Sequence, residues 1–403
     1  MNQTEQELMK YIEEEDVKFI RLTFCDIYGA QKNISIQRGE LARAFDKGIG
    51  IDASYLDGFG GDYGKDIWLH PEPDTITILP WRPEHGRVVR IFCTLTYADG
   101  TPIETDTRAL LRQAVRYAQS KGFRFHFKSE MQFYLFKTDE SGESTGVPYD
   151  NAGYMDIAPL DKGENVRREI CLTLEQMGIQ PESSHHEAGP GQNEIDFCYA
   201  DPITAADNTV TFLSVVRTMA ARNGLYADFS PKPIKDKAGS ALHITVSVKS
   251  NAGDDVTDSA IAGILHNVAG MTVFLNPTVG SFLRFGQHKA PKYITWSGNN
   301  RAQLISVRLT ESGSRCAQVR SPDPEANPYL AFALMIYAVL DGIENQRALP
   351  QPVDEDFLLF QSKTKEEPER LPDSIEKARI EAKKSPLIQQ FIPSSVIRLY
   401  CAN

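Results

Sequence analysis

Residues 185–194 read His-His-Glu-Ala-Gly-Pro-Gly-Gln-Asn-Glu, and this stretch decides the fold. It places two carboxylates, Glu187 and Glu194, on either side of a Gly-Pro-Gly turn. From residue 192 onward, Gln192, Glu194 and Asp196 alternate with other side chains, so the segment predicts a strand with one polar face. Two carboxylates that a turn brings together are candidate ligands for a divalent metal ion.

Three other segments repeat this alternation and offer polar side chains at every second position. In residues 123–136, 192–197, 242–248 and 316–320 the polar faces carry Arg124, His126, Lys128, Glu130, Gln132, Gln192, Glu194, Asp196, His243, Thr245, Ser247, Cys316, Gln318 and Arg320. An antiparallel sheet with one wet face explains any single strand of this kind. Four strands with Glu, Gln, His and Arg at their centres favour a concave polar face around a metal or an anionic ligand. Carboxylates with an imidazole suit Mg²⁺ or Mn²⁺.

Composition excludes several classes of protein. A chain of 403 residues is too long for one ordinary core and predicts two domains. A net charge of −11 argues against nucleic acid or an anionic membrane surface as a partner. No run approaches the ~18–20 consecutive apolar residues of a membrane helix, and the acidic N-terminus lacks signal-peptide features. The six cysteines lack C-x-x-C spacing, so we expect reduced thiols in a cytoplasmic protein.

The order of elements predicts an α+β fold with a small N-terminal domain. Strands are expected at 17–25, 33–36, 75–79 and 87–97, with helices at 3–14 and 38–47 and loops over 48–73. The turn at 98–102 predicts a boundary between domains 1–100 and 101–403. Further helices are expected at 106–121, 164–177, 203–223, 257–274, 325–343, 373–384 and 386–391.

Basic residues suggest what a metal would help to hold. Arg284, Arg301 and Arg320 recur through the second half, and Lys232 lies in Phe-Ser-Pro-Lys-Pro. Guanidinium groups bind carboxylate and phosphate through paired hydrogen bonds, although a single arginine is usually a surface ion pair. The chain has neither G-x-x-x-x-G-K-[ST] nor G-x-G-x-x-G, so neither common nucleotide-binding loop is indicated.

Together these motifs resemble the glutamine synthetase family, in a type I-like form. The matching segments are 48–59, 66–81, 129–136, 186–194, 229–233, 239–243, 276–279, 300–301 and 320–329. The resemblance implies a small β-grasp-like N-terminal domain and a large catalytic domain with a curved antiparallel sheet. It also implies a homo-oligomeric ring, and we expect a dodecamer. The implied reaction phosphorylates the γ-carboxylate of glutamate with ATP, and ammonia then attacks the γ-glutamyl phosphate.

The resemblance also assigns roles to individual residues. Glu187 and Glu194 match ligands of a first Mg²⁺ or Mn²⁺, and Glu130 and His243 match ligands of a second; Gln132 and Gln318 are weak candidates. The catalytic candidates are Asp52, which matches the aspartate that deprotonates ammonium, Arg284 and Arg301. The substrate-binding candidates are Gly239, Arg284 and Arg320. The nucleotide-binding candidates are Lys232, Ser247 and Arg301.

This chain departs from the family pattern inside the site. Gln132 and Gln318 stand where carboxylate ligands are usual, so much of the attraction to a dication is lost. Thr245 stands for a second histidine, Ser306 and Cys316 for nucleotide-binding arginines, and Ala238 for an asparagine. Lys289 stands where a glutamate closes over the site, and a lysine has the wrong charge to attract ammonium.

Three hypotheses follow from these departures. The first is an active glutamine synthetase with weaker metal binding. The second is a ligase of the same fold that uses a different amine, such as a γ-glutamylamide synthetase. The third is a non-catalytic relative that binds a ligand or a partner. The sequence leaves the amine, the ring size and the regulation open.

Overall fold

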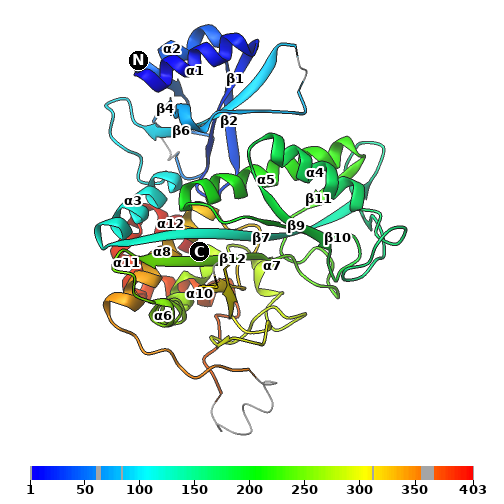
Figure 1. The fold of residues 1–403 in the computed structure, drawn as a ribbon, viewed down its shortest axis with the longest axis vertical. Helices are drawn as coiled ribbons and strands as arrows, with labels where there is room; N and C mark the ends of the chain where they lie inside the picture. The colour runs from blue at the N-terminus through cyan, green and yellow to red at the C-terminus, as the bar shows by residue number, and fades with distance from the viewer. Residues whose placement is uncertain (1, 60–64, 83–84, 311–312, 355–366, 403) are drawn as a thin grey trace. The chain divides into compact units, whose positions relative to one another are not determined.

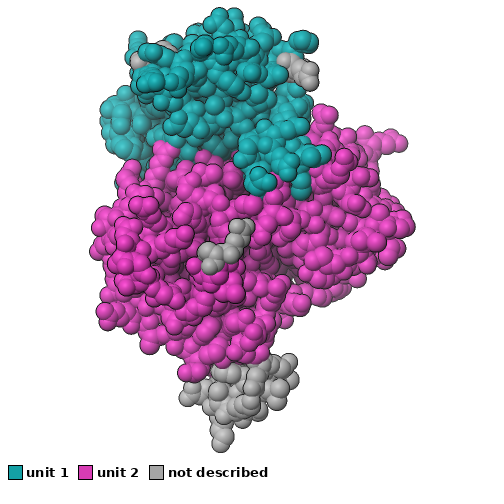
Figure 2. Space-filling model, viewed as in Figure 1, with its two compact units in different colours: residues 1–110, 171–180 teal, residues 111–170, 181–403 magenta. Residues whose placement is uncertain are grey.

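A computed structural model describes residues 2–59, 65–82, 85–310, 313–354 and 367–402. It forms two compact units, which are coloured separately in Figure 2. Unit 1 comprises Met1–Leu110 and Cys171–Gln180, and unit 2 comprises Leu111–Ile170 and Pro181–Asn403. The predicted domain boundary at residue 100 stays a prediction.

Unit 1 is a small sheet covered by short helices. Its elements are α1 (Gln3–Glu14), β1 (Val17–Cys25), β2 (Gln31–Gln37), η1 (Arg38–Glu40), α2 (Leu41–Lys47), β3 (Ile49–Ile51), β4 (Ile67–Pro71), η2 (Pro73–Thr75), β5 (Thr77–Ile78) and β6 (Arg87–Thr96). The strand order is β2-β1-β6-β4-β3, with β5 paired to β6. A cluster that includes Leu8, Ile20 and Ile91 fills the core.

The predicted loop over residues 48–73 was wrong in part, because β3 and β4 lie within it. In β4, Ile67, Leu69 and Pro71 are buried while Trp68 and His70 are half-buried. This is ordinary strand alternation. The segment is short and ends in proline, and proline is a turn signal that hid the pattern.

Unit 2 is built on a nine-stranded sheet. Seven strands follow the order β13-β14-β15-β12-β7-β10-β9, and the other two, β8 and β11, pair with β7. Its strands are β7 (Phe123–Thr138), β8 (Ser144–Pro148), β9 (Pro181–His186), β10 (Gln192–Phe197), β11 (Leu225–Asp228), β12 (Leu242–Ser250), β13 (Trp296–Ser297), β14 (Ile305–Leu309) and β15 (Arg315–Val319). Its pairs are antiparallel apart from β13–β14, so the predicted α+β class with an antiparallel sheet is confirmed.

Helices pack around this sheet and against one another. They are α3 (Thr107–Ser120), α4 (Glu164–Gln176), α5 (Pro202–Arg222), α6 (Thr257–Leu275), α7 (Val279–Phe282), α8 (Pro328–Glu344), α10 (Ile375–Lys384), α11 (Pro386–Phe391) and α12 (Ser394–Cys401). Figure 1 shows β7 running across the whole unit. The Phe127 ring of β7 stacks on Phe332 of α8 with centroids 4.4 Å apart, and Phe133 meets Phe212 of α5 at 5.9 Å. Because alternate residues point to opposite faces, these contacts turn Glu130 and Gln132 away from the helices.

Helices α6 and α8 pack closely where Gly263 of α6 meets Gly342 of α8. A Cβ on Gly263 would lie 2.1 Å from the carbonyl oxygen of Ala338, and one on Gly342 would lie 2.0 Å from that of Ser259. Among the described residues, α6 alone is long and apolar enough to cross a membrane, but 78% of its apolar window is buried. Its hydrophobicity therefore serves the core.

Candidate functional site

The four predicted polar strands are neighbours in the sheet, in the order β15-β12-β7-β10. Glu130 lies opposite His243 on one side and Asp196 on the other. One step along, Gln132 lies opposite Glu194. The register therefore confirms the shared polar face that the alternation predicted, while the chemical role of each residue stays a prediction.

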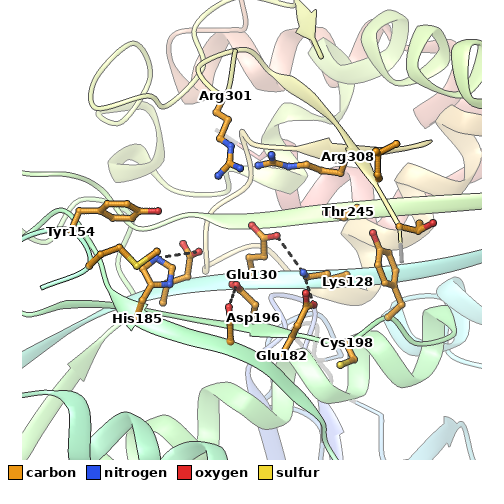
Figure 3. A pocket seen from close by; sticks show the side chains of 16 residues that line it. Lys128, Glu130, Tyr154, Glu182, His185, Asp196, Cys198, Thr245, Arg301 and Arg308 are labelled. Atoms are coloured by element: carbon orange, nitrogen blue, oxygen red, sulfur yellow. Dashed lines mark hydrogen bonds and ion pairs between the residues drawn. The ribbon is translucent and has the colours of Figure 1, made fainter. Parts of the chain in front are cut away.

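A pocket of about 390 Å³ opens over this face (Figure 3). It is lined by Lys128, Glu130, Tyr154, Met155, Glu182, Ser183, His185, Glu194, Asp196, Cys198, Tyr199, Thr245, Arg301, Arg308, Leu309 and Thr310. Charge is unevenly distributed in it. The β9–β10 side carries mainly carboxylates, and the guanidinium groups of Arg301 and Arg308 lie on the β14 side, directed toward one another (Figure 3). One end of the pocket therefore suits a cation and the other an anion.

The acidic end gathers an imidazole and two carboxylates. His185 Nε2 lies 3.4 Å from Glu187 Oε1 and 3.9 Å from Glu194 Oε1. This buried nitrogen has no hydrogen-bond partner. The Tyr154 ring meets the imidazole edge-on, with centroids 5.5 Å apart, and holds its orientation. An unpartnered ring nitrogen between two carboxylates is the arrangement that a bound cation would complete.

Gln132 has both of its amide atoms engaged with the protein. Its Nε2 donates to Glu194 Oε2 at 2.6 Å, and its Oε1 accepts from the backbone N–H of Ala241 at 2.9 Å. The side chain therefore acts on Glu194 as a hydrogen-bond donor, which a glutamate at this position could not do. Its weak candidacy as a ligand is disfavoured by these contacts and stays a prediction.

The carboxylates along β10 hold their protons more tightly than usual. Burial raises the pKa of Glu194 well above its ordinary range, and the neighbouring carboxylates, Asp196 foremost, raise it further. Burial and the charge of Glu130 raise the pKa of Asp196 to about 6. Asp196 Oδ1 is buried and has no hydrogen-bond partner. Crowded carboxylates of this kind are stabilised by any cation that enters.

Glu130 and His243 form the centre of the face. Glu130 Oε2 lies 3.5 Å from His243 Nδ1. Burial alone would raise the pKa of Glu130, but His243, Lys128 and Arg308 outweigh it and lower the pKa to about 2. Burial lowers the pKa of His243 to about 4, so its imidazole is neutral at physiological pH. Glu130 is therefore a fixed negative charge.

The basic end is organised by Gln318. Its Oε1 accepts hydrogen bonds from Arg308 Nη2 at 3.0 Å and from Arg320 Nη1 at 3.0 Å. Burial and the charge of Arg308 lower the pKa of Arg320 to about 10, which leaves Arg320 protonated. With its oxygen between two guanidinium groups, Gln318 is disfavoured as a metal ligand, and that assignment stays a prediction.

The residues fit one divalent cation well. His185, Glu187 and Glu194 each offer a ligand atom, and these atoms lie within 4.8 Å of one another. Glu130, Glu194 and Asp196 form a second such group, which shares Glu194 with the first. At the second predicted cation position, His243 Nδ1 lies 3.5 Å from Glu130 Oε2 and Gln318 Oε1 accepts from two guanidinium groups, and this assignment stays a prediction.

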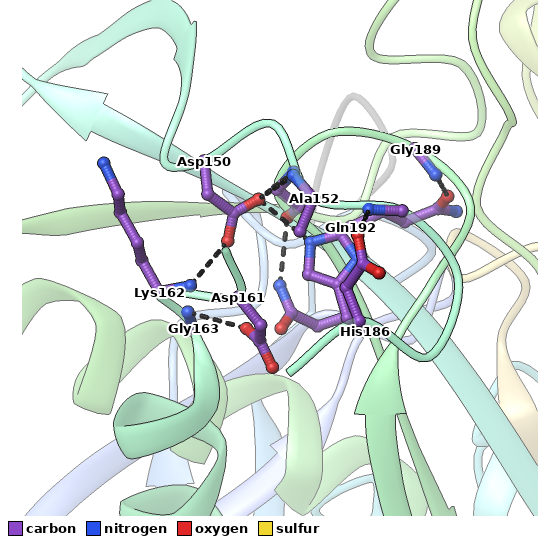
Figure 4. Close-up of polar contacts among 12 residues, drawn as sticks. Asp150, Ala152, Asp161, Lys162, Gly163, His186, Gly189 and Gln192 are labelled. Atoms are coloured by element: carbon purple, nitrogen blue, oxygen red, sulfur yellow. Dashed lines mark hydrogen bonds and ion pairs between the residues drawn. The ribbon is translucent and has the colours of Figure 1, made fainter. Parts of the chain in front are cut away.

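A buried polar network braces the acidic turn from behind (Figure 4). His186 Nε2 contacts Asp150 Oδ1 at 2.9 Å, and its Nδ1 contacts the carbonyl of Glu187 at 2.7 Å. Arg167 bridges Asp161 and Asn193, the residue before Glu194. His186 is 0% exposed. The two halves of the turn are thus fixed through the residues adjoining Glu187 and Glu194.

Several predicted residues lie away from the pocket lining. Asp52 belongs to unit 1, is exposed, and accepts the backbone N–H of Ser54. Arg284 is 2% exposed and donates to the carbonyl of Ser321. A Cβ on Gly239 would lie 2.6 Å from Arg284 Cγ, so the two predicted substrate residues are in contact. Their roles stay predictions.

The nucleotide candidates lie on three different segments of the chain. Lys232 Nζ donates to the carbonyl of Lys237 and to Gln287 Oε1. Ser247 is buried on β12, opposite His126 and two residues beyond Thr245. Arg301 is exposed and lines the pocket.

The positions that depart from the family pattern are distributed as follows. Ser306 lies opposite Gln318, and Cys316 lies opposite Arg308. Ala238 accepts a hydrogen bond from the hydroxyl of Tyr134 at 2.6 Å. Lys289 is exposed with a φ of 66°. Ser306 therefore lies on the strand that carries Arg308, and Cys316 lies on the neighbouring strand.

Sequence reasoning assigned no role to His185, Asp196, Lys128 or Arg308. His185 stands inside the quoted motif, and Lys128 and Asp196 share the polar faces of Glu130 and Glu194, so alternation could have identified them. Arg308 lies on β14, which was not predicted; the alternation of Ser306 and Arg308 with Ile305 and Val307 was the available signal.

Comparison with known proteins agrees with this geometry. The family model described as "Glutamine synthetase, beta-Grasp domain" matches residues 16–97, and "Glutamine synthetase, catalytic domain" matches residues 104–403. The glutamine synthetase of Staphylococcus epidermidis is 44% identical over 368 residues, which are 88% of this chain and 82% of that protein. The glutamine synthetase of Staphylococcus aureus is 43% identical over the same shares.

Solved structures show the same architecture. One described as "GmaS/ADP complex-Conformation 1" matches with a TM-score of 0.87 and 26% identity, covering 98% of this chain and 94% of that one. Another, "Apo GmaS without ligand", gives 0.86 and 26%, with 98% and 93% covered. The predicted β-grasp and catalytic domains are confirmed. Since family models match both parts of the chain and the motif strands share one polar face, the chain belongs to the glutamine synthetase family.

Proposed function

We propose that this chain is an ATP-dependent carboxylate–amine ligase that converts glutamate and ammonia to glutamine through γ-glutamyl phosphate. The observation that carries the proposal is the division of one pocket into an acidic and a basic end. Forming an acyl phosphate requires a polyphosphate and a carboxylate to be held together, which concentrates negative charge. A cation site beside guanidinium groups is suited to that task.

The acidic end would hold Mg²⁺ or Mn²⁺ through His185, Glu187 and Glu194. When bound there, such a cation neutralises phosphate charge and polarises a phosphoryl oxygen. The chain's own residues then orient the reactants. Arg301 and Arg308 present guanidinium forks to anionic groups, and the buried network behind the turn keeps the carboxylates in position.

The remaining assignments are part of the same proposal. Arg320, Gly239 and Arg284 would contact glutamate, and Lys232 and Ser247 would contact the nucleotide. Asp52 would take a proton from ammonium. The chain would work as a homo-oligomeric ring, expected to be a dodecamer, in the cytoplasm. The likeness to a structure described as an ADP complex supports a nucleotide in this fold.

A second candidate is a ligase of the same type that uses another amine. Two features favour it. Lys289 places a positive charge in the loop where a carboxylate would attract ammonium, and Gln132 and Gln318 reduce the negative charge of the site. An uncharged or bulkier amine would depend less on that attraction.

The test is phosphate release from ATP by the purified protein. Glutamate and ammonium with Mg²⁺ or Mn²⁺ are compared with glutamate and a panel of primary amines. Release with ammonium supports the first candidate, and release only with another amine supports the second. If calorimetry shows no ADP binding at millimolar metal, both ligase proposals fail and a non-catalytic binding role is left.

A further inference from the structure

Arg308, which lines the basic end of the pocket, shares one amide oxygen with Arg320. Gln318 is 0% exposed, and its Oε1 accepts from Arg308 Nη2 and Arg320 Nη1, each at 3.0 Å. Arg308 Nε adds a longer contact of 3.3 Å. Because an amide oxygen is neutral and strongly polar, it orients both guanidinium groups without cancelling their charge. Gln318 therefore serves to hold two cationic side chains.

Glu130 is the carboxylate beside these arginines, and protein groups already face it. Lys128 Nζ lies 3.8 Å from Glu130 Oε1, and His243 Nδ1 lies 3.5 Å from Oε2. Lys128 is itself paired with Glu182 at 2.5 Å. A dication entering between Glu130, His243 and Gln318 would have Glu130 as its carboxylate ligand, with Glu194 and Asp196 in the same acidic group, and would face the two guanidinium charges held on Gln318. Those two charges and Lys128 offset the attraction of Glu130 at this position.

The opposite end has the reverse balance. Glu187 and Glu194 lie there with the imidazole of His185, and Glu194 also groups with Asp196 and Glu130. The two groups of possible ligands share Glu194, but the second contains Glu130, which Lys128 and His243 already face, so the first group is the better cation position. Apart from the neighbouring carboxylates, the side chains that contact Glu194 at this end are an imidazole and a neutral amide, from His185 and Gln132.

We propose that each chain binds one divalent cation, at the acidic end, and that Arg308 and Arg320 held on Gln318 supply the positive charge of a second. The proposal rests on the proposed function, since the two-cation expectation comes from the glutamine synthetase reaction. In this arrangement the guanidinium groups of Arg308 and Arg320 take the place of a second dissociable cation. The site consequently depends on one metal instead of two.

The direct test is the stoichiometry of Mn²⁺ on the intact assembly, measured by equilibrium dialysis with electron paramagnetic resonance of free Mn²⁺ at physiological salt. One tight Mn²⁺ per chain is expected. Two tight ions of comparable affinity, or none, would overturn the proposal.

Variants at Gln318 and Arg308 test whether the guanidinium group of Arg308 prevents a second Mn²⁺ from binding. In Gln318→Glu the new carboxylate is expected to pair with both arginines, so the stoichiometry stays at one. The double change Gln318→Glu with Arg308→Gln frees that carboxylate beside Glu130. The stoichiometry is then expected to rise to two Mn²⁺ per chain. Two ions in the single variant, or one in a folded double variant, would contradict the role given to Arg308. Arg308→Gln alone provides a second folded reference if the double variant fails to assemble.

Arg315→Gln is the matched control, since Arg315 lies on the same hairpin but pairs with Asp255 and Asp258 outside the pocket. It should leave the stoichiometry at one. The phosphate-release assay is read separately. Two Mn²⁺ with phosphate release overturns this inference and leaves the ligase, whereas one Mn²⁺ with no release under any amine supports the inference and rejects the ligase.

Discussion

Gln132 Nε2 donates a 2.6 Å hydrogen bond to Glu194 Oε2, across adjacent strands of the sheet. A neutral donor thus occupies the place where a second carboxylate would share a metal with Glu194. The donor relieves part of the cost of burying a carboxylate without a cation. On the other oxygen, Glu194 Oε1 lies 3.9 Å from His185 Nε2, so the two oxygens of this buried carboxylate face an amide and an imidazole.

Gln132→Glu should make the site dependent on metal. Two carboxylates would then face one another in a buried position, so the variant is expected to lose about 1–3 kcal/mol of unfolding free energy in chelator. Its affinity for Mn²⁺ should rise, because each added carboxylate attracts the dication. Urea unfolding in chelator and calorimetric titration with Mn²⁺ measure the two effects. Gln132→Met is the uncharged control, and a gain of Mn²⁺ affinity in that control would refute the explanation.

His185→Ala should weaken Mn²⁺ binding at least tenfold, roughly as the loss of a ligand or of its support does elsewhere. The reason is that the unpartnered Nε2 lies within 4 Å of both Glu187 and Glu194. Calorimetry gives the affinity. The control is His266→Ala, an exposed histidine on α6. Equal affinity in the two variants would remove His185 from the cation site.

Asp196→Asn should change the pH dependence of stability. The folded pKa of Asp196 is raised from 3.8 to about 6, so its contribution to stability is present below pH 3.8 and is lost as pH rises through about 6. The asparagine side chain of the variant does not ionise, so this loss of stability with rising pH does not occur in it. In chelator, the variant is expected to gain on the order of 1–3 kcal/mol at pH 8 and little at pH 4. Urea titrations at both pH values decide, with Asp236→Asn in an exposed loop as the control.

Arg167→Leu should strongly destabilise unit 2. The side chains of Arg167 and Asp161 are 6% and 2% exposed, so removing one partner leaves a buried charge. A loss of about 3–5 kcal/mol is expected. The exposed pair of Lys377 and Asp373 offers a comparison, where Lys377→Leu should cost under about 1 kcal/mol. Similar costs for both pairs would show that the network behind the turn is unimportant.

Gly239→Ala should disturb Arg284. The added Cβ would lie 2.5 Å from the carbonyl oxygen of Pro231 and 2.6 Å from Arg284 Cγ, so one of them must move. A cost of about 1–3 kcal/mol is expected from overpacking. Gly298→Ala is the control, because nothing lies within 4 Å of its added Cβ. Denaturant unfolding that does not distinguish the two variants would argue against the close approach.

The sequence alone determined the family, the strands and the polar faces. Alternation has a fixed period of two, so residue spacing assigns Glu130, Gln132, Glu194 and His243 to one side of their strands. The motif order did the same for the two domains. Strands β4 and β14 were missed: β4 ends in proline among turn signals, and β14 is a short strand, although β15, of equal length, was predicted from its alternation.

Only the tertiary structure decided what those side chains do to one another. The register of β7 against β10 places Gln132 in hydrogen-bond contact with Glu194. The register of β14 against β15 places Arg308 in hydrogen-bond contact with Gln318. The first contact joins strands that are far apart in the chain, and both depend on a register that the local pattern does not specify. The division of the pocket into an acidic and a basic end follows from that register. The proposal that each chain binds one cation follows from this division.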